Sequence, residues 1–281
     1  MNVQKKLAIG FLRIKLNLLS VISKRITGET AFKLFCTPFA KYKGKEAAIF
    51  KDAQKLQFTL AGNVIKGYRC NYPQKNKVLL LHGFSSTCHK FDKYAAALIN
   101  KGYEVLAFDA PAHGASDGKT VNAVDYSEMI KEVNTLYGPI NAFIAHSFGG
   151  IAVSLALEQM PHTPATKLVL IAPATETTSA INGAFTMLGI RNKTIRQSMD
   201  DIIFKMSGQK TEWYSIRRAI KNISASVLWV HDEDDLVTPV ADALKVKDDA
   251  PPHVQFLLTK GLGHQKIYRD AMVKNSIVNF L

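Results

Sequence analysis

The sequence predicts an α/β fold: a mostly parallel central sheet covered by helices on both faces, with a small helical lid inserted late in the sheet. Short apolar runs with little alternation recur along the 281 residues, and amphipathic helical patterns lie between several of them. Such runs are typical of parallel strands, because right-handed crossovers place helices over both faces of the sheet. The composition, with 47% hydrophobic and 21% charged residues, is that of a globular chain.

The predicted sheet begins with a hairpin. Residues 55–70 alternate in part and break at Gly62-Asn63, as a tight turn would. The runs expected to form buried strands then follow at residues 78–82, 104–109, 142–147, 167–172, 226–231 and 254–258.

Helices are expected between these strands. Two amphipathic patterns, over residues 91–102 and 124–138, each close at a glycine. The interval 173–225 is about three times as long as the other crossovers and carries further helical patterns. We expect this insertion to be a lid, because ligands enter such sheets at the carboxyl ends of the strands.

The first 50 residues are predicted to be a basic amphipathic helical segment ahead of the α/β domain of residues 51–281. Arg13 and Lys15 interrupt the apolar stretch 7–22, which is therefore too short to cross a bilayer, and no signal cleavage site follows. One helical face of this stretch is apolar: it carries Leu7, Phe11, Ile14, Leu18 and Val21. Two interpretations stay open, docking of residues 1–35 on an anionic membrane surface and packing of the helix on its own domain.

Charge and cysteine content exclude several classes. The net charge of +13 lies wholly in the first 77 residues, which hold 16 Lys and Arg against 3 acidic residues, whereas the remainder holds 20 of each. No nucleic-acid recognition motif accompanies this charge, so no nucleic-acid partner is expected. The three cysteines have neither paired nor metal-ligand spacing, which argues against disulfides and zinc and favours a reducing, cytoplasmic setting.

One segment has the pattern of a nucleophile. Ser147, in the sequence AHSFGG, follows a buried strand and leads directly into a helical run. A serine at such a sharp strand-to-helix corner needs small residues two positions before and after it, and Ala145 and Gly149 are small. The alternative interpretation is a serine that only caps the helix.

A hydroxyl nucleophile needs a base, and the base needs an orienting carboxylate. His264 follows the last predicted strand, and Asp235 follows the strand before it. Both therefore lie at carboxyl ends of strands, in the order Ser, Asp, His. Taken singly, a loop histidine or an acidic run is more often a solvated surface feature.

Acyl transfer also needs N–H donors for a developing oxyanion. The sequence His82-Gly83-Phe84 ends the first parallel strand, and we expect the backbone N–H groups of Phe84 and Phe148 to form the oxyanion hole. His82 is interpreted as a structural residue of this loop. Cys88 has no partnered histidine other than its neighbour His89, so a cysteine nucleophile is not expected.

From residue 78 to the end, the chain resembles the α/β-hydrolase superfamily. The resemblance rests on HGFSS, DAPAHGASDG, AHSFGG, HDEDDLVTP and GLGH, in that order. It implies that Ser147 is the nucleophile, Asp235 the acid and His264 the base, and that the segment with Asp109, His113 and Gly114 is a structural turn. Ala145 and Ala112 replace glycines of the family pattern, and Asp234 and Glu176 are alternative acids.

The resemblance implies a serine hydrolase that cleaves the carboxylic ester of a small or medium acyl substrate, without metal or organic cofactor. A serine at the corner argues against the dehalogenase and epoxide hydrolase relatives, which use aspartate there. A thioesterase, a carbon–carbon bond hydrolase and a peptidase are alternatives with the same triad. An alternative of another class is a non-catalytic module on a hydrolase scaffold that binds a membrane surface or a protein. The sequence carries no signal for an oligomeric state.

Overall fold

The computed structural model of the protein describes residues 3–39 and 46–281, so parts of the predicted segment 1–50 lie outside the described residues. The chain divides into two compact units. One, the helical unit, comprises Met1–Thr37 and Glu176–Tyr214; the other, the sheet unit, comprises Pro38–Thr175 and Ser215–Leu281. The predicted domain boundary at residue 50 and the role of the insertion as a lid stay predictions.

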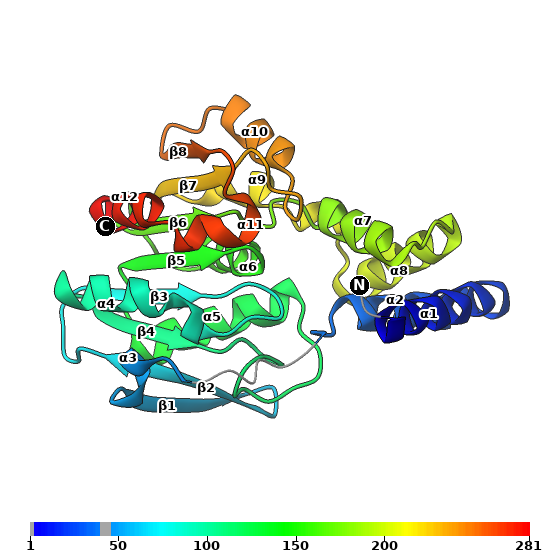
Figure 1. Ribbon diagram of the computed structural model, residues 1–281, viewed down its shortest axis with the longest axis horizontal. Coiled ribbons are helices and arrows are strands. Elements are labelled where there is room, and N and C mark those ends of the chain that lie inside the picture. Colours follow the sequence, from blue (N-terminus) through cyan, green and yellow to red (C-terminus); the bar gives the residue numbers. More distant parts are fainter. Residues whose placement is uncertain (1–2, 40–45) are drawn as a thin grey trace. The chain divides into compact units, whose positions relative to one another are not determined.

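The sheet unit contains an eight-stranded sheet with the strand order β1-β2-β4-β3-β5-β6-β7-β8 (Figure 1). β1 and β2 form an antiparallel hairpin, β2 pairs antiparallel with β4, and all other pairings are parallel. The strands are β1 (Gln54–Leu60), β2 (Asn63–Cys70), β3 (Lys77–Leu81), β4 (Glu104–Phe108), β5 (Ala142–His146), β6 (Lys167–Ile171), β7 (Ser226–Asp232) and β8 (Val254–Thr259). The prediction of a mostly parallel sheet is confirmed.

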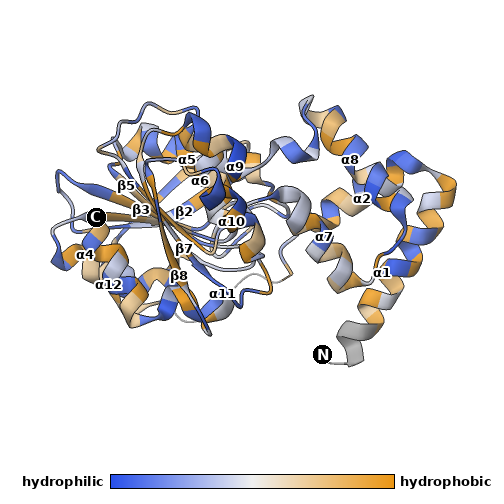
Figure 2. Cartoon of the chain, turned by 90° about the horizontal axis from the view of Figure 1, so that it is seen from above, coloured by the Kyte–Doolittle hydropathy of each residue, from blue (hydrophilic) through white to orange (hydrophobic). Residues whose placement is uncertain are grey.

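Helices cover both faces of this sheet. Figure 2 shows α4 and α12 on one side of the strands and α5, α6 and α9 on the other. The helices of the sheet unit are α3 (Ala48–Lys51), α4 (Asp92–Asn100), α5 (Ala123–Tyr137), α6 (Phe148–Leu157), α9 (Ile216–Ala219), α10 (Val240–Asp248), α11 (Gly263–Lys266) and α12 (Ala271–Phe280). Short 3₁₀ turns are η1 (Cys88–Phe91), η3 (Ile220–Asn222) and η4 (Ile267–Arg269).

Local sequence signals set the ends of these elements. Asn122 caps α5 in a reciprocal capping box with Asp125, and the helix ends at Gly138. The β1–β2 turn consists of Ala61 and Gly62, both at positive φ, one residue before the predicted break.

One prediction about the strands is wrong. β8 is half-buried rather than enclosed on both faces, because it pairs only with β7 and forms the edge of the sheet. The central strands β4 and β5 are buried along their whole length. The apolar core under α4 and α12 joins side chains of β3, such as Leu80, to Tyr94 and Ile277 of these helices.

The helical unit contains α1 (Val3–Ile22), α2 (Lys24–Phe35), α7 (Thr177–Leu188), α8 (Lys193–Ser207) and the 3₁₀ turn η2 (Thr211–Trp213). Ser23 caps α2 by accepting a hydrogen bond from the N–H of Ile26. α2 packs closely on α8 at Gly28, where a side-chain carbon would collide with the carbonyl of Ser198. None of the helices in the described ranges has both the length and the apolarity that a bilayer span requires.

Candidate active site

Ser147 occupies a strained corner between β5 and α6. Its φ of 54° lies in the region that favours glycine, and its ψ is −116°. The backbone around it is tied on two sides, because its N–H donates to the carbonyl of Ile171 at 3.0 Å and its carbonyl accepts from the N–H of Ala174 at 3.0 Å. These bonds to the neighbouring strand and the loop that follows it hold the corner in a conformation that a serine rarely adopts.

The small residues around Ser147 are needed for this corner. Ala145 is completely buried inside the sheet. A side-chain carbon on Gly149 would lie 2.7 Å from the carbonyl oxygen of Leu81, at the end of β3. The corner therefore brings the start of α6 against the neighbouring strand, which any larger residue at position 149 would prevent.

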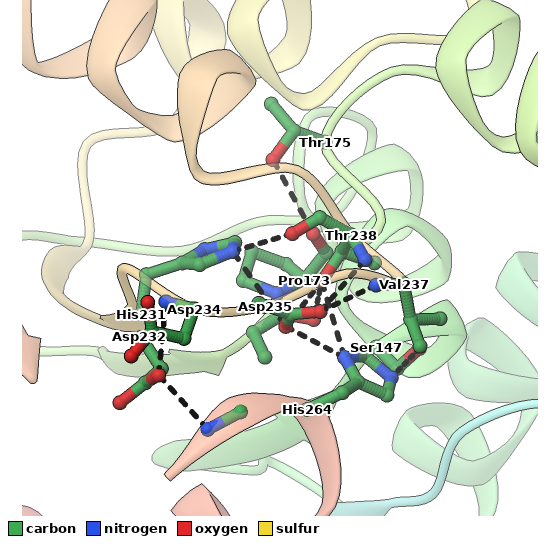
Figure 3. Close-up of polar contacts among 12 residues, drawn as sticks. Ser147, Pro173, Thr175, His231, Asp232, Asp234, Asp235, Val237, Thr238 and His264 are labelled. Atoms are coloured by element: carbon green, nitrogen blue, oxygen red, sulfur yellow. Dashed lines mark hydrogen bonds and ion pairs between the residues drawn. The ribbon is translucent and has the colours of Figure 1, made fainter. Parts of the chain in front are cut away.

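His264 and Asp235 meet Ser147 at the same edge of the sheet (Figure 3). The Nε2 atom of His264 lies 3.0 Å from the Oγ atom of Ser147, and its Nδ1 atom lies 2.8 Å from Oδ2 of Asp235. The three residues come from the ends of β5, β7 and β8, which run parallel and therefore end at one edge. The structure thus brings together the three side chains that the sequence predicted as nucleophile, acid and base.

Asp235 is held as a carboxylate. Its Oδ1 atom accepts from the N–H groups of Val237 at 2.8 Å and Thr238 at 2.9 Å, and the hydroxyl of Thr238 lies 2.8 Å from Oδ2. Burial raises the pKa of Asp235, but the hydrogen bond and charge of His264 and the two backbone donors outweigh burial, so its pKa is lowered.

The neighbouring acidic residues have other partners. Asp234 accepts from the N–H of Gly261 at 3.0 Å, and Asp232 accepts from the N–H groups of Leu262 and Gly263 at 3.1 and 2.8 Å. These two carboxylates therefore hold the loop that carries His264. Glu176, the other alternative acid, belongs to the helical unit.

A family model supports the relationship that the motifs suggested. The model for the serine aminopeptidase family S33, one of the α/β hydrolases, matches residues 72–215, just over half of the chain. The chain belongs to this α/β-hydrolase family.

Solved structures show the same fold as this α/β hydrolase. An esterase from Pyrococcus furiosus aligns over 88% of the chain and 97% of its own length, with a TM-score of 0.66 and 16% identity. The thioesterase domain from the curacin biosynthetic pathway aligns over 82% and 98%, with a TM-score of 0.59 and 16% identity. At these identities the likeness concerns the fold alone.

A sequence relative covers a smaller part of the hydrolase. A serine hydrolase-like protein from Dictyostelium discoideum is 31% identical over 91 residues. The match spans 31% of this chain and a quarter of the length of that relative.

The loop after β3 in the hydrolase approaches Ser147. A side-chain carbon on Gly83 would lie 3.1 Å from the Cβ atom of Ser147. The ring of Phe84 meets the ring of Phe148 edge to face, with centroids 5.4 Å apart. Phe148 is the first residue of α6, and the N–H of a first helical residue has no partner within its own helix. The predicted oxyanion residues are therefore neighbours.

His82 and His113 brace this loop. His82 accepts from the N–H of Ala110 at 3.0 Å, and its other ring nitrogen donates to the carbonyl of Gly83 at 2.8 Å. His113 accepts from the N–H of Ser85 at 2.8 Å. Burial lowers the pKa of His82, which keeps its ring neutral. Both histidines hold backbone groups in place, as the structural interpretation expects.

His146 is a site residue that sequence reasoning missed. Its Nε2–H donates to the carbonyl of His264 at 3.1 Å, and its ring packs 4.8 Å from the ring of His264 and 4.6 Å from that of Tyr268, measured between centroids. Burial, followed by the charge of His264, lowers its pKa to about 3. Its position directly before Ser147 is the feature of the sequence that could have indicated a role at the site.

Thr238 was missed as well. Its hydroxyl lies within hydrogen-bonding distance of Asp235 Oδ2, of the carbonyl of Ala172 at 3.1 Å and of His264 Nδ1 at 3.2 Å. Its position three residues after Asp235 places it on the same turn, which the sequence could have indicated.

Cys88 is enclosed, and its surroundings disfavour the thiolate that a cysteine nucleophile needs. It is completely buried, and burial followed by the nearby charge of Asp109 raises the pKa of its thiol well above the usual value. Within the described ranges, no group of three or more His, Cys, Asp or Glu side chains is placed to hold a metal ion.

Proposed function

We propose that the protein is a serine hydrolase that cleaves the carboxylic ester of a small or medium acyl substrate through an acyl-enzyme. One observation carries the proposal: the hydroxyl of Ser147, on a strained corner, lies 3.0 Å from an imidazole that Asp235 contacts at 2.8 Å. Membership of an α/β-hydrolase family supports it.

In the proposed reaction, His264 Nε2 takes the proton of Ser147 as Oγ attacks the ester carbonyl carbon. The N–H groups of Phe84 and Phe148 stabilise the oxyanion of the tetrahedral intermediate. His264 then protonates the leaving alcohol. In the second half, a water molecule gives a proton to His264 and attacks the acyl carbon. The bond between that carbon and Oγ then breaks, His264 returns the proton to Ser147, and the carboxylic acid leaves.

Asp235 stays ionised throughout this cycle. Its lowered pKa favours the carboxylate, which fixes the Nδ1–H tautomer of His264 and stabilises the imidazolium that forms. Every chemical role in the reaction has a protein group, so the proposal invokes no cofactor.

Two observations favour an ester with an apolar acyl group as the substrate. The likeness in fold to proteins described as an esterase and a thioesterase favours acyl transfer to water. Leu236 and Val237, directly after Asp235, are apolar and exposed, which favours a substrate with an apolar acyl group. A thioester, a carbon–carbon bond next to a carbonyl and a peptide remain alternative substrates for the same triad.

The first test is labelling of the folded protein with a fluorophosphonate probe, which reacts with activated serines. We expect labelling of the natural protein and none of Ser147→Ala, because no other serine is proposed to be activated. Labelling that persists in Ser147→Ala would reject Ser147 as the nucleophile. A folded natural protein that takes no label would favour the non-catalytic binding module.

The second test identifies the bond that is cleaved. p-Nitrophenyl esters of rising acyl length, acyl-CoA thioesters and aminoacyl p-nitroanilides are compared by kcat/KM. We expect the highest values for esters of short or medium length. A clear preference for thioesters or for anilides would keep the triad and replace the substrate class.

A further inference from the structure

The helix α1 is apolar on two opposite faces. Leu12 and Leu16 lie on the face that contacts the rest of the helical unit, and Leu16 is completely buried. The opposite face, called the α1 stripe, consists of five large apolar side chains that are each 61–89% exposed: Leu7, Phe11, Ile14, Leu18 and Val21. A contiguous row of large exposed apolar side chains on a helix that already buries another face marks an interaction surface.

Polar contacts fix which face of α1 points away from the helical unit. The side-chain amide of Asn192, which caps α8, donates to Asn17 Oδ1 at 3.0 Å and to Ser20 Oγ at 3.1 Å. The guanidinium of Arg13 lies against Gly189. These contacts are made by the side of α1 that is opposite to the stripe. They therefore hold the stripe on the outer surface of the helical unit.

The charge around the α1 stripe is strongly positive. Residues 1–37 contain seven Lys and Arg and a single acidic residue, Glu29. Lys15 on α1 is exposed, as are Lys24 and Arg25 at the start of α2. Glu29 lies 3.9 Å from Arg25 in an exposed pair, which leaves the surface positive overall.

We propose that the α1 stripe docks the protein on an anionic lipid bilayer, with α1 lying in the plane of the headgroups. An interfacial helix of this kind buries its apolar side chains at the acyl boundary while Lys and Arg bind lipid phosphates. A second copy of the chain fits less well, because pairing two such stripes would bring two clusters of cations together without acidic partners. The proposal does not depend on the hydrolase reaction.

The experiment is co-sedimentation of the full chain with phosphatidylcholine vesicles that either contain or lack phosphatidylserine, over a series of salt concentrations. We expect binding to the vesicles that contain phosphatidylserine, weaker binding to neutral vesicles, and release as salt rises. Protein that stays in the supernatant with both vesicles at low salt would overturn the proposal.

Point variants distinguish the contribution of the α1 stripe to vesicle binding from the contribution of positive charge. Phe11→Asp and Leu18→Asp are each expected to lower the vesicle partition constant by more than about tenfold, because each removes a large apolar side chain from the interface. Lys15→Gln is expected to lower it by about fivefold. The matched control is Leu136→Asp on α5, also an exposed leucine, which should leave binding unchanged.

Two further measurements complete the test. Circular dichroism establishes that each variant is folded, which is expected because the substituted side chains are exposed. Analytical ultracentrifugation without lipid measures the oligomeric state. Vesicle binding that survives both stripe variants would overturn the proposal, and so would a lipid-free dimer that Phe11→Asp separates, because the stripe would then cover a second copy.

Discussion

Two helices of this protein, α6 and α1, are both rich in apolar residues and differ in burial. Neither contains an acidic residue, but α1 carries four Lys and Arg whereas α6 carries none. In α6, nine of ten residues are buried, from Gly149 to Leu157. In α1, Leu16 is the only residue buried to that degree among residues 7–22. Apolar composition therefore does not decide burial.

The difference lies in what surrounds each helix. α6 leaves β5 through the corner at Ser147 and packs on α5 and α9, so apolar surface meets it on several sides. α1 contacts α2 and α8 through one face only. The apolar side chains of α6 are enclosed and hold the proposed nucleophile in place. Those of the α1 stripe stay exposed and form a surface on which a partner could dock.

The largest effect is expected at Asp235, which orients the base for the nucleophile at the start of α6. Asp235→Asn should lower kcat/KM by about 10⁴-fold while the fold is kept, because His264 would lose its orienting charge and its tautomer. The measurement is hydrolysis of the best p-nitrophenyl ester.

The adjacent residue supplies a matched control. Asp234→Asn, which alters only the bond to Gly261, is expected to change kcat/KM by less than about threefold. A large loss in Asp234→Asn or Glu176→Gln, with activity kept in Asp235→Asn, would move the acid to another residue.

A matched pair of glycines compares the two helices directly. Gly149→Ala should destabilise the protein by about 1–3 kcal/mol, because its side-chain carbon would lie 2.7 Å from the Leu81 carbonyl oxygen. Gly10→Ala should stabilise α1 by about 0.5–1 kcal/mol, because the added carbon would meet no atom within 4 Å beyond the adjacent backbone of its own helix, and alanine favours helix. Denaturant unfolding, followed by circular dichroism, measures both changes. Equal effects of the two substitutions would contradict the difference in packing between α6 and α1.

His146 gives the stability of the protein a pH dependence. Its pKa is about 3 in the folded protein and about 6.5 when unfolded, so between these values the unfolded chain binds a proton that the folded chain does not. Its contribution to stability is therefore complete above about pH 6.5 and falls by about 1.4 kcal/mol per pH unit as the pH drops toward 3.

His146→Phe removes this contribution and the bond to the carbonyl of His264. We expect a shallower loss of stability between about pH 6 and pH 4, measured by denaturant unfolding, with His82 and His231 still contributing through their own lowered pKa values. kcat is expected to fall by about tenfold, because His264 loses a positioning contact. An unchanged pH slope together with an unchanged kcat would show that His146 only fills space.

Much of the fold was predictable because parallel strands are buried on both faces. The runs around residues 104–108 and 142–146 are continuous and apolar, and each was placed to within a residue of its observed bounds. β8 was misjudged because its apolar run resembles those of the central strands, and only its place at the sheet edge leaves it half-buried.

The order of motifs along the chain determined by itself that Ser147, Asp235 and His264 follow strands of one parallel sheet, since parallel strands end at a common edge. Tertiary structure alone decided which carboxylate faces His264, because Asp234 and Asp235 are adjacent and differ only in the direction that the turn gives them. It likewise decided the enclosed position of His146 and the outward direction of the α1 stripe. Those properties depend on atoms distant in the chain, whose packing no local periodicity encodes.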